Sequence, residues 1–402
     1  MCKADFVTNP MPRDTMTQKS KHATLSEVAT RAGVGTTTVS RVINGSQKVD
    51  PKTLARVQRA IASLGYVPNQ AARILKGGRT RTIGFVIPSI ADPFFSRCAE
   101  AAQSVARAND SLLIVLTTQN EPKAELDAVH VLLRHRVDGF MISPSNPNSE
   151  VLRDLVSRLS VPIVALDRPI AGSTIPYVVA DNFTGGQIAT GHLIEHGYKR
   201  IVCLTGEVDL YTIHERIRGY KAAMKAAGLE PVVDTSIKDH RSAEQALDRM
   251  LNSSRPPEAI FTLKNSTTIH IFEVLQKQNV AIPGTVALLG FDDFELAETV
   301  RPSITVIQQP IDQIGRMAAE LLFDRMLAPA DGATTRKQHI HLKTQLILRA
   351  SCGCSPDHAP APRPSHKPPS PAAATTAQMP TAAASGPPFS LTNRPRPISK
   401  SI

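Results

Sequence analysis

Polar side chains that could read DNA bases recur along residues 36–44, in the stretch TTTVSRVIN. In a major groove, arginine can bond guanine bidentately, asparagine can bond adenine, and threonine methyl groups can contact thymine. The helical period places apolar residues on the inner face and leaves five polar residues outward: Thr36, Thr37, Ser40, Arg41 and Asn44. The same pattern also suits a solvent-exposed helix in any small bundle. Motifs of this kind have many false positives, so the pattern alone does not decide between the two interpretations.

Neighbouring helices must hold that helix in place. Thr24 and Glu27 have the spacing of a capping box, and apolar residues follow them at helical spacing. Gly33 can adopt the left-handed conformation of a tight turn. Asp50 and Pro51 are a cap and a first-turn proline, which predict another helix start. The stretch 24–66 therefore predicts three short helices that include a helix-turn-helix.

A second set of polar and aromatic side chains follows the apolar runs of the later sequence. These residues are Asp92, Phe94, Phe95, Ser143, Asp167, Arg168, Tyr211, Thr212, Arg216, Lys264, Asn265, Phe291 and Asp292. Carboxylates that accept hydroxyl protons, arginines and an aromatic wall suit a polyol ligand. Lys264 and Arg241 add positive charge, which would suit an acidic sugar or a phosphate. Arg216 and Asp292 could instead pair with each other across the cleft as structure.

The elements that must position this second set alternate between strand and helix. Nine apolar runs predict strands: 83–87, 112–116, 139–142, 162–166, 177–180, 201–204, 259–262, 286–289 and 304–307. Amphipathic stretches between them predict helices: 94–108, 121–136, 185–196, 215–227, 242–253, 266–279 and 311–327. Continuous apolar strands separated by helices indicate parallel sheets, which bind ligands at the carboxyl ends of their strands.

Charge separates the chain into a basic head and a neutral body. The first 81 of the 402 residues hold 14 Lys or Arg and 4 Asp or Glu, a net charge of +10, against +11 for the whole chain. This segregation fits nucleic-acid binding by the head. No apolar run reaches the ~18–20 residues of a membrane span, and residues 1–21 lack the apolar core of a secretory signal. We therefore expect a cytoplasmic protein without membrane contact.

Two short motifs resemble metal sites but are incomplete. His192 and His196 stand in the string HLIEH, which matches H-x-x-E-H and places both imidazoles on one helical face. No third ligand is evident in that string, so we interpret it as structural. Cys352 and Cys354 form a Cys-Gly-Cys pair, whereas a zinc site usually needs four ligands. The sequence analysis therefore assigns no metal, no cofactor and no catalytic residue.

Several ordered motifs lie across about residues 24–353. They include GVGTTTVSRVING, VDGFMISPS, VVADNFTGGQIATGHLIEHGYKRI, VALLGFDDF and ITVIQQPIDQIG. Together these motifs resemble the lactose/galactose repressor (LacI–GalR) family. The resemblance implies an all-α helix-turn-helix DNA-binding head. It also implies an α/β body of two Rossmann-like subdomains, like type I periplasmic binding proteins. Crossovers would lie near Ala180 and Gln308-Gln309-Pro310. The family usually has serine where this chain has Gly35, and glycine costs only a few tenths of a kcal/mol at a helix cap.

The same resemblance implies roles for particular residues. The DNA-binding set is Thr24, Thr36, Thr37, Ser40, Arg41, Asn44, Tyr66, Asn69 and Leu75. Leu75 would be the wedge that a hinge helix inserts into the minor groove, although the residues alone would also suit a plain linker helix. The effector-binding set is Phe94, Ser143, Asp167, Arg168, Arg216, Asn265 and Asp292. The partners would be palindromic double-stranded operator DNA, a sugar, sugar acid or sugar phosphate, and a second copy of the chain in a homodimer.

These expectations give a domain plan. Residues 1–22 are expected to be a disordered extension, 23–68 the DNA-binding domain, 69–81 the hinge, 82–353 the effector-binding domain and 354–402 a disordered Pro/Ala-rich tail. Within the body, the N-subdomain comprises about 82–180 and 310–330, and the C-subdomain about 181–309 and 336–353. The function is then that of a ligand-controlled transcriptional regulator. The alternatives are a periplasmic-type sugar-binding protein and an α/β enzyme that uses the same cleft.

Overall fold

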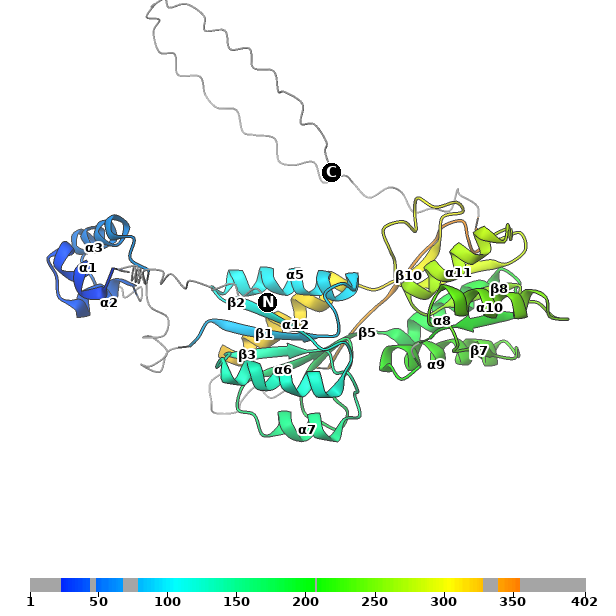
Figure 1. The fold of residues 1–402 in the computed structure, drawn as a ribbon, viewed down its shortest axis with the longest axis horizontal. Helices are drawn as coiled ribbons and strands as arrows, with labels where there is room; N and C mark the ends of the chain where they lie inside the picture. Colours follow the sequence, from blue (N-terminus) through cyan, green and yellow to red (C-terminus); the bar gives the residue numbers. More distant parts are fainter. Residues whose placement is uncertain (1–22, 44–47, 68–78, 207, 328–338, 355–402) are drawn as a thin grey trace, which may run out of the picture. The chain divides into compact units, whose positions relative to one another are not determined.

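The structure is a computed structural model that describes residues 23–43, 48–67, 79–206, 208–327 and 339–354 (Figure 1). The expected N-terminal extension, most of the expected hinge and the Pro/Ala-rich tail lie outside the described residues, and so do Asn44, Asn69 and Leu75. None of the described helices is both long enough and apolar enough to cross a membrane.

The head consists of three helices: α1 (Leu25–Ala32), α2 (Thr36–Ile43) and α3 (Pro51–Leu64). The capping box forms as predicted, since the Thr24 amide donates to the Glu27 carboxylate at 2.7 Å and the Glu27 amide donates to Thr24 Oγ1 at 3.3 Å. Gly33 ends α1 at φ 61°. The Asp50 carboxylate caps α3 by accepting from the Thr53 amide at 3.0 Å, a bond that holds the pKa of Asp50 below its usual range.

A small apolar core holds the three head helices together. Its buried members come from all three helices: Val28, Ala29, Ala32, Val39, Val57 and Ala60. Val42 and Ile43 pack against this core from α2, which confirms the inner face predicted for that helix. Arg56 ties α3 to the turn after α1, because its guanidinium donates to the backbone carbonyls of Ala32 and Gly33.

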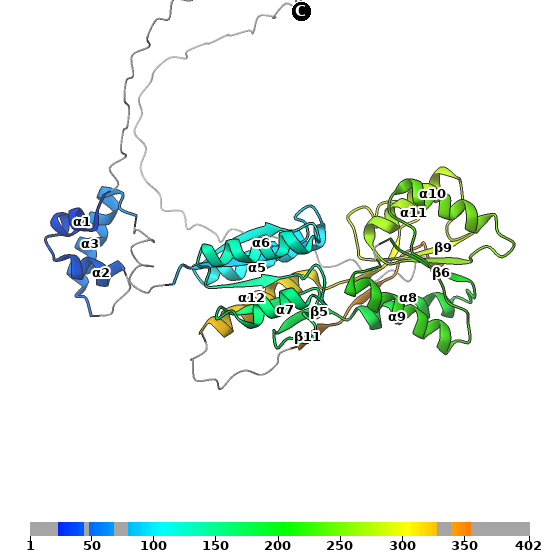
Figure 2. The ribbon, with the colours of Figure 1, turned by 60° about the horizontal axis from the view of Figure 1, so that its bottom comes forward.

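The N-subdomain is a six-stranded sheet in the order β11-β5-β4-β3-β1-β2. Its strands are β1 (Thr82–Ile87), β2 (Leu112–Thr117), β3 (Gly139–Ile142), β4 (Ile163–Leu166), β5 (Tyr177–Ala180) and β11 (His339–Leu342), and all pairs are parallel. One apolar core joins the sheet to α5 (Pro93–Ala108) and α12 (Ile311–Leu327). Another joins its other face to α6 (Pro122–Arg134) and α7 (Glu150–Ser157), as Figure 1 shows, and Figure 2 gives the same elements turned by 60°.

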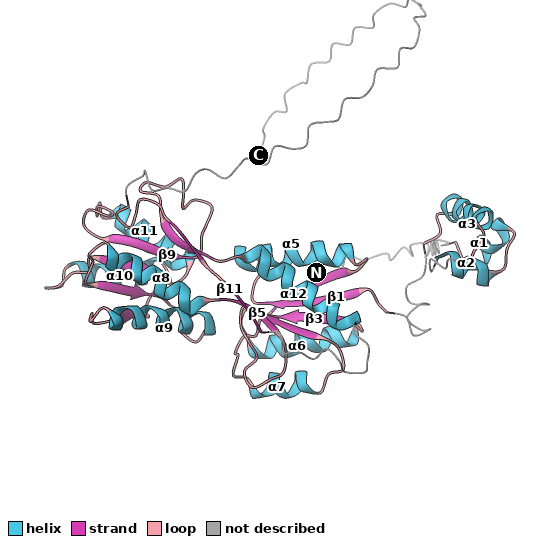
Figure 3. Cartoon of the chain, turned by 180° about the vertical axis from the view of Figure 1, so that it is seen from behind, coloured by secondary structure: helices cyan, strands magenta, loops and turns pink. Residues whose placement is uncertain are grey.

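The C-subdomain repeats this architecture with the order β12-β10-β9-β8-β6-β7. Its strands are β6 (Ile201–Leu204), β7 (Val232–Asp234), β8 (Ala259–Thr262), β9 (Ala287–Phe291), β10 (Thr305–Gln308) and β12 (Gln345–Ile347), of which β12 alone is antiparallel to its neighbour. One core contains α8 (Asn182–Glu195) and α9 (Tyr211–Ala226), and the other contains α10 (His240–Leu251) and α11 (Asn265–Lys277). Figure 3 shows the strands between layers of helices.

The chain passes between the two subdomains three times, as the expected subdomain bounds imply. Two of these crossovers follow β5 and β10, near the expected positions, whereas the domain plan places the third between residues 330 and 336. The third lies between β11 and β12, because β11 pairs with β5 of the N-subdomain. The expected assignment of 336–353 to the C-subdomain is therefore wrong for residues 339–342. This strand alternates exposed and half-buried residues, so it lacks the continuous apolar run that marks the other strands.

Candidate DNA-reading face and effector cavity

The outward face of α2 is the candidate DNA-reading surface. Thr36, Thr37 and Arg41 are exposed and Ser40 is half-buried. Two other residues of the predicted set have contacts within the head. Thr24 is the N-cap of α1, and Tyr66 is half-buried against the head core. The face therefore presents two hydroxyls and one guanidinium to solvent, from a helix whose opposite side is fixed in the core.

A cavity of about 1120 Å³ is lined by residues of both subdomains. Most of these residues follow the carboxyl ends of strands, as parallel sheets predict. Six of the seven predicted effector-binding residues line it: Phe94, Asp167, Arg168, Arg216, Asn265 and Asp292. Ser143 does not. It directly follows β3, but its side chain is fully buried and its hydroxyl has no hydrogen-bond partner among the described residues.

Arg216 is the most heavily bonded side chain of the cavity wall. Its Nε donates to Asn182 Oδ1 at 2.8 Å, and its Nη1 donates to the Leu263 carbonyl at 2.6 Å and to Asp292 Oδ2 at 3.1 Å. Its guanidinium carbon lies 3.7 Å from the centre of the Phe291 ring, a cation–π contact. Arg216 is 3% exposed. The sequence left open whether Arg216 and Asp292 pair across the cleft. The structure shows that they do pair, but within the C-subdomain, so the expected pairing across the cleft is wrong.

Each subdomain places one aspartate at positive φ directly after a strand. Asp167 follows β4 at φ 65°, and Asp292 follows β9 at φ 73°. Few residues other than glycine adopt this conformation, and its occurrence at a cavity wall is typical of functional sites. Each carboxylate is bonded to an arginine, Asp167 to Arg168 at 3.1 Å and Asp292 to Arg216. The two walls of the cavity thus carry the same pair of groups.

The Asp167–Arg168 pair is almost completely buried, with both side chains less than 10% exposed. Burial raises the pKa of Asp167, while the nearby guanidinium of Arg168 opposes that shift. Arg168 is fixed from the other side, because its Nη1 donates to Asn120 Oδ1 at 2.8 Å and to the Pro144 carbonyl at 3.0 Å. The carboxylate is therefore a preorganised hydrogen-bond acceptor at the wall.

Close packing of α8 against α9 positions Arg216 beside Asn182. Gly186 and Gly219 allow it, because a Cβ on Gly186 would lie 2.4 Å from the Arg216 carbonyl oxygen and one on Gly219 would lie 2.1 Å from the Phe183 carbonyl oxygen. The Thr184-Gly185-Gly186 sequence at the start of α8 thus serves helix packing. Without Gly186, the backbone that carries Arg216 would have to move.

Gly186→Ala is therefore expected to destabilise the body. Overpacking of this kind costs about 1–3 kcal/mol, and urea unfolding monitored by circular dichroism measures it. Gly191→Ala is the matched control, since Gly191 lies in the same helix with nothing within 4 Å of its Cβ position. That change is expected to be stabilising by about 0.4–1 kcal/mol. Equal unfolding midpoints for the two variants would contradict the packing role.

Several cavity residues were not predicted as effector-binding. Gln309 Nε2 donates to Asp292 Oδ1 at 2.6 Å, and Arg349 binds Asp293 through both terminal nitrogens at 2.9 and 3.0 Å. Gln309 follows β10, so its position after a strand was the signal available in the sequence. Arg349 follows the unpredicted strand β12, so nothing marked it. Arg241, which the sequence suggested as a source of positive charge, is not among the lining residues.

A basic helix-turn-helix head joined to a two-subdomain α/β body with a central ligand cavity defines a ligand-controlled DNA-binding regulator. Residues 24–69 match the family described as "Bacterial regulatory proteins, lacI family". Residues 80–348 match "Periplasmic binding proteins and sugar binding domain of LacI family". The chain belongs to the LacI family of transcriptional regulators.

Named relatives and solved structures agree with this assignment. The chain is 32% identical to the ribose operon repressor of Escherichia coli strain K12, over 82% of this chain and 99% of that protein. It is 32% identical to the transcriptional regulator CelR in complex with cellobiose. That match has a TM-score of 0.60 and covers 82% of this chain and 100% of the CelR chain. It is 25% identical to the lac repressor dimer bound to operator and the anti-inducer ONPF. That match has a TM-score of 0.74 and covers 83% of this chain and 99% of the lac repressor chain. These proteins are regulators and not enzymes.

Proposed function

We propose that the protein is a cytoplasmic, homodimeric repressor whose affinity for a palindromic operator is set by a neutral sugar in the cavity. The observation that carries the proposal is the cavity wall itself. Two Asp–Arg pairs, Asp167–Arg168 and Arg216–Asp292, present fixed acceptors and donors at a cavity that Phe94 also lines. This arrangement suits a ring with several hydroxyl groups, which donate to carboxylates and accept from guanidinium groups.

The pairing of the arginines favours a neutral sugar over a sugar acid or a sugar phosphate. Arg97, Arg168, Arg216 and Arg349 all line the cavity, and each is paired with a carboxylate. An anion would have to compete with those carboxylates for each guanidinium group. The ribose operon repressor and the CelR–cellobiose complex among its relatives are consistent with an uncharged sugar.

The dimer and the link to DNA rest on the family. The lac repressor relative is a dimer bound to its operator, and a two-fold dimer matches a palindrome. We propose that residues 67–81 transmit the state of the body to the head, with Leu75 as the minor-groove wedge. The effector then acts through its differential affinity for two states of the body.

Thermal unfolding with a panel of sugars tests the ligand class. Neutral aldopentoses, hexoses and cellobiose are the first arm, and the corresponding sugar acids and phosphates are the second. We expect a neutral sugar to raise the melting temperature, because a ligand at 100 times its Kd stabilises by about 2.7 kcal/mol. Asn265→Ala is expected to remove that shift, since Asn265 lines the cavity at the start of α11.

Gln278→Ala is the matched control, because Gln278 caps the other end of α11 and does not line the cavity. It should leave the sugar-induced shift unchanged. Stabilisation by phosphorylated sugars alone would contradict the neutral-sugar assignment. A normal shift in Asn265→Ala would place the ligand elsewhere.

A further inference from the structure

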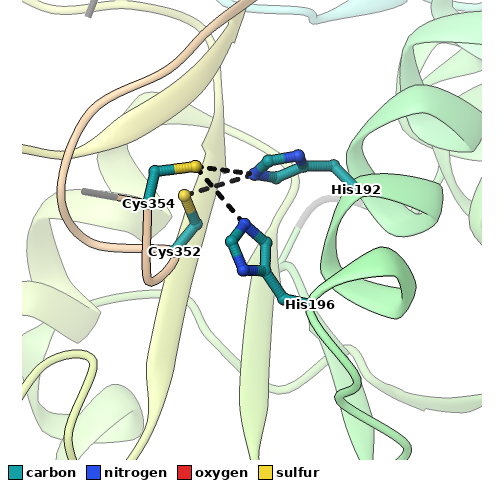
Figure 4. A group of neighbouring side chains, drawn as sticks. All are labelled: His192, His196, Cys352 and Cys354. Atoms are coloured by element: carbon teal, nitrogen blue, oxygen red, sulfur yellow. Dashed lines mark hydrogen bonds between the residues drawn. The ribbon is translucent and has the colours of Figure 1, made fainter. Parts of the chain in front are cut away.

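Four metal-binding side chains meet at the end of α8 opposite the effector cavity. His192 and His196 lie on its last turn and C-cap, and Cys352 and Cys354 lie in the segment that follows β12. One ligand atom from each lies within 4.8 Å of all the others. Figure 4 shows both imidazoles and both thiols directed toward one another. We propose that these four residues bind a zinc ion.

The local structure brings the ligands together in two pairs. The histidines are four residues apart, which places their side chains on adjacent turns of one helical face, with the two rings edge to face. Gly353 separates the cysteines at φ 101°. A Cβ on Gly353 would lie 2.9 Å from the Tyr198 hydroxyl oxygen, and that hydroxyl donates to the Cys352 carbonyl at 3.3 Å. The turn that directs both thiols toward α8 therefore requires glycine between them.

The distances match the edges of a tetrahedral zinc site. His192 Nε2 lies 3.2 Å from Cys352 Sγ and 3.6 Å from Cys354 Sγ, and His196 Nε2 lies 3.3 Å from Cys354 Sγ. With Zn–S about 2.3 Å and Zn–N about 2.0–2.1 Å, a tetrahedron has ligand–ligand edges of about 3.3–3.8 Å. An ion at the centre would thus need only small movements of the four side chains.

The ligand chemistry selects zinc and a structural role. On binding, the two thiols release their protons and the imidazoles coordinate as neutral groups, so two thiolates balance the charge of Zn²⁺. That balance matters because Cys352 is fully buried and His192 is 9% exposed. A tetrahedral set of two nitrogens and two sulfurs is typical of zinc, and four protein ligands leave no position for a reactive water. Thr305 Oγ1 donates to Cys352 Sγ at 3.1 Å, which orients that ligand.

The ion would link the segment that follows β12 to the C-terminal end of α8 in the C-subdomain. α8 has 14 residues, so its C-terminal end lies about 20 Å from Asn182, which bonds Arg216 at the cavity. The site is therefore separate from the effector cavity. Each half supplies only two of the four ligands, and the sequence does not join the halves because they are 160 residues apart along the chain.

Metal analysis of the purified full-length protein tests the proposal. We expect about one zinc per chain, and cobalt(II) exchanged into the site should give the intense visible absorption of a tetrahedral ion together with a thiolate-to-cobalt charge-transfer band. Cys354→Ser and His196→Gln are expected to weaken zinc binding at least about 100-fold in chelator competition, more than the loss of an outer-sphere contact. Cys2→Ser and His135→Gln are the matched controls, since each removes the same chemical group from a residue that is not one of the four proposed ligands.

His196 is exposed, so His196→Gln is expected to fold, and its circular dichroism spectrum and operator binding serve as the check. The proposal is overturned by a wild-type protein that carries no zinc and shows no tetrahedral spectrum after cobalt(II) is added. It is also overturned if the folded His196→Gln and Cys354→Ser variants hold zinc as tightly as the two controls.

Discussion

Replacing Arg216 by alanine is expected to lower the free energy of unfolding by about 3 kcal/mol, the lower end of the cost of breaking a buried ion pair. Arg216 is almost fully buried, whereas the Asp292 side chain is 18% exposed and keeps the Gln309 amide as a donor. The change also leaves Asn182 Oδ1 and the Leu263 carbonyl without the donor that Arg216 supplies. Urea unfolding of the full-length protein measures the loss.

Arg218→Ala is the control for that measurement. Arg218 lies on the same helix, but its side chain is 63% exposed and pairs with Glu215 at the surface. Ion pairs at the surface contribute about 0–1 kcal/mol to the free energy of unfolding. Combining Arg216→Met with Asp292→Leu should cost less than the two single changes together, because the pair is then removed as a unit. If Arg216→Ala lost no more stability than Arg218→Ala, the buried pair would not stabilise the C-subdomain.

Replacing Arg41 by alanine is expected to weaken binding to the cognate operator by about 1–3 kcal/mol, with a smaller loss on random DNA. Arg41 is exposed on α2, whose inner face is fixed by Val39 in the head core. A bidentate contact to guanine discriminates among bases, whereas a phosphate contact weakens binding to all sequences alike. Fluorescence anisotropy on an operator that the wild-type protein selects from a random pool measures both affinities.

Arg59→Ala controls for the loss of one positive charge from the head. Arg59 is exposed on α3, where its Nε donates to the Ala55 carbonyl. We expect Arg59→Ala to leave the ratio of operator to random-DNA affinity unchanged. Equal losses on both DNAs for Arg41→Ala would show that Arg41 contacts phosphate instead of bases.

Most of the fold could be predicted from the sequence because the central strands are buried on both faces. All nine predicted strands are present, and four of them, such as β3, have the predicted bounds. The three missed strands, β7, β11 and β12, are edge strands of three or four residues. Each has exposed positions, so periodicity does not distinguish it from a loop. The helix α7 is also not among the helices that the sequence analysis names.

The positions of the cavity residues could be predicted, but the sequence could not decide how their side chains pair. Strand ends placed Asp167 and Asp292 at the ligand edge of each sheet. The sequence offered the Arg216–Asp292 pair only as an alternative, and nothing in it indicated the contact of Arg216 with Asn182, since that contact depends on the packing of α8 on α9. Ser143 also follows a strand, yet it is fully buried and not part of the cavity wall. The position of a residue directly after a strand predicts the edge of the sheet at which that residue lies. It does not predict the direction in which its side chain points.

The central claim is that a sugar in the cavity controls operator affinity. The most direct measurement titrates the selected operator with the wild-type protein, with and without a saturating concentration of the sugar that raises its melting temperature. We predict a change of about 5–150-fold in operator affinity, equivalent to a coupling of about 1–3 kcal/mol. Asn265→Ala should bind the operator normally and show no change with sugar. An operator affinity that the bound sugar leaves unchanged in the wild-type protein would contradict this account.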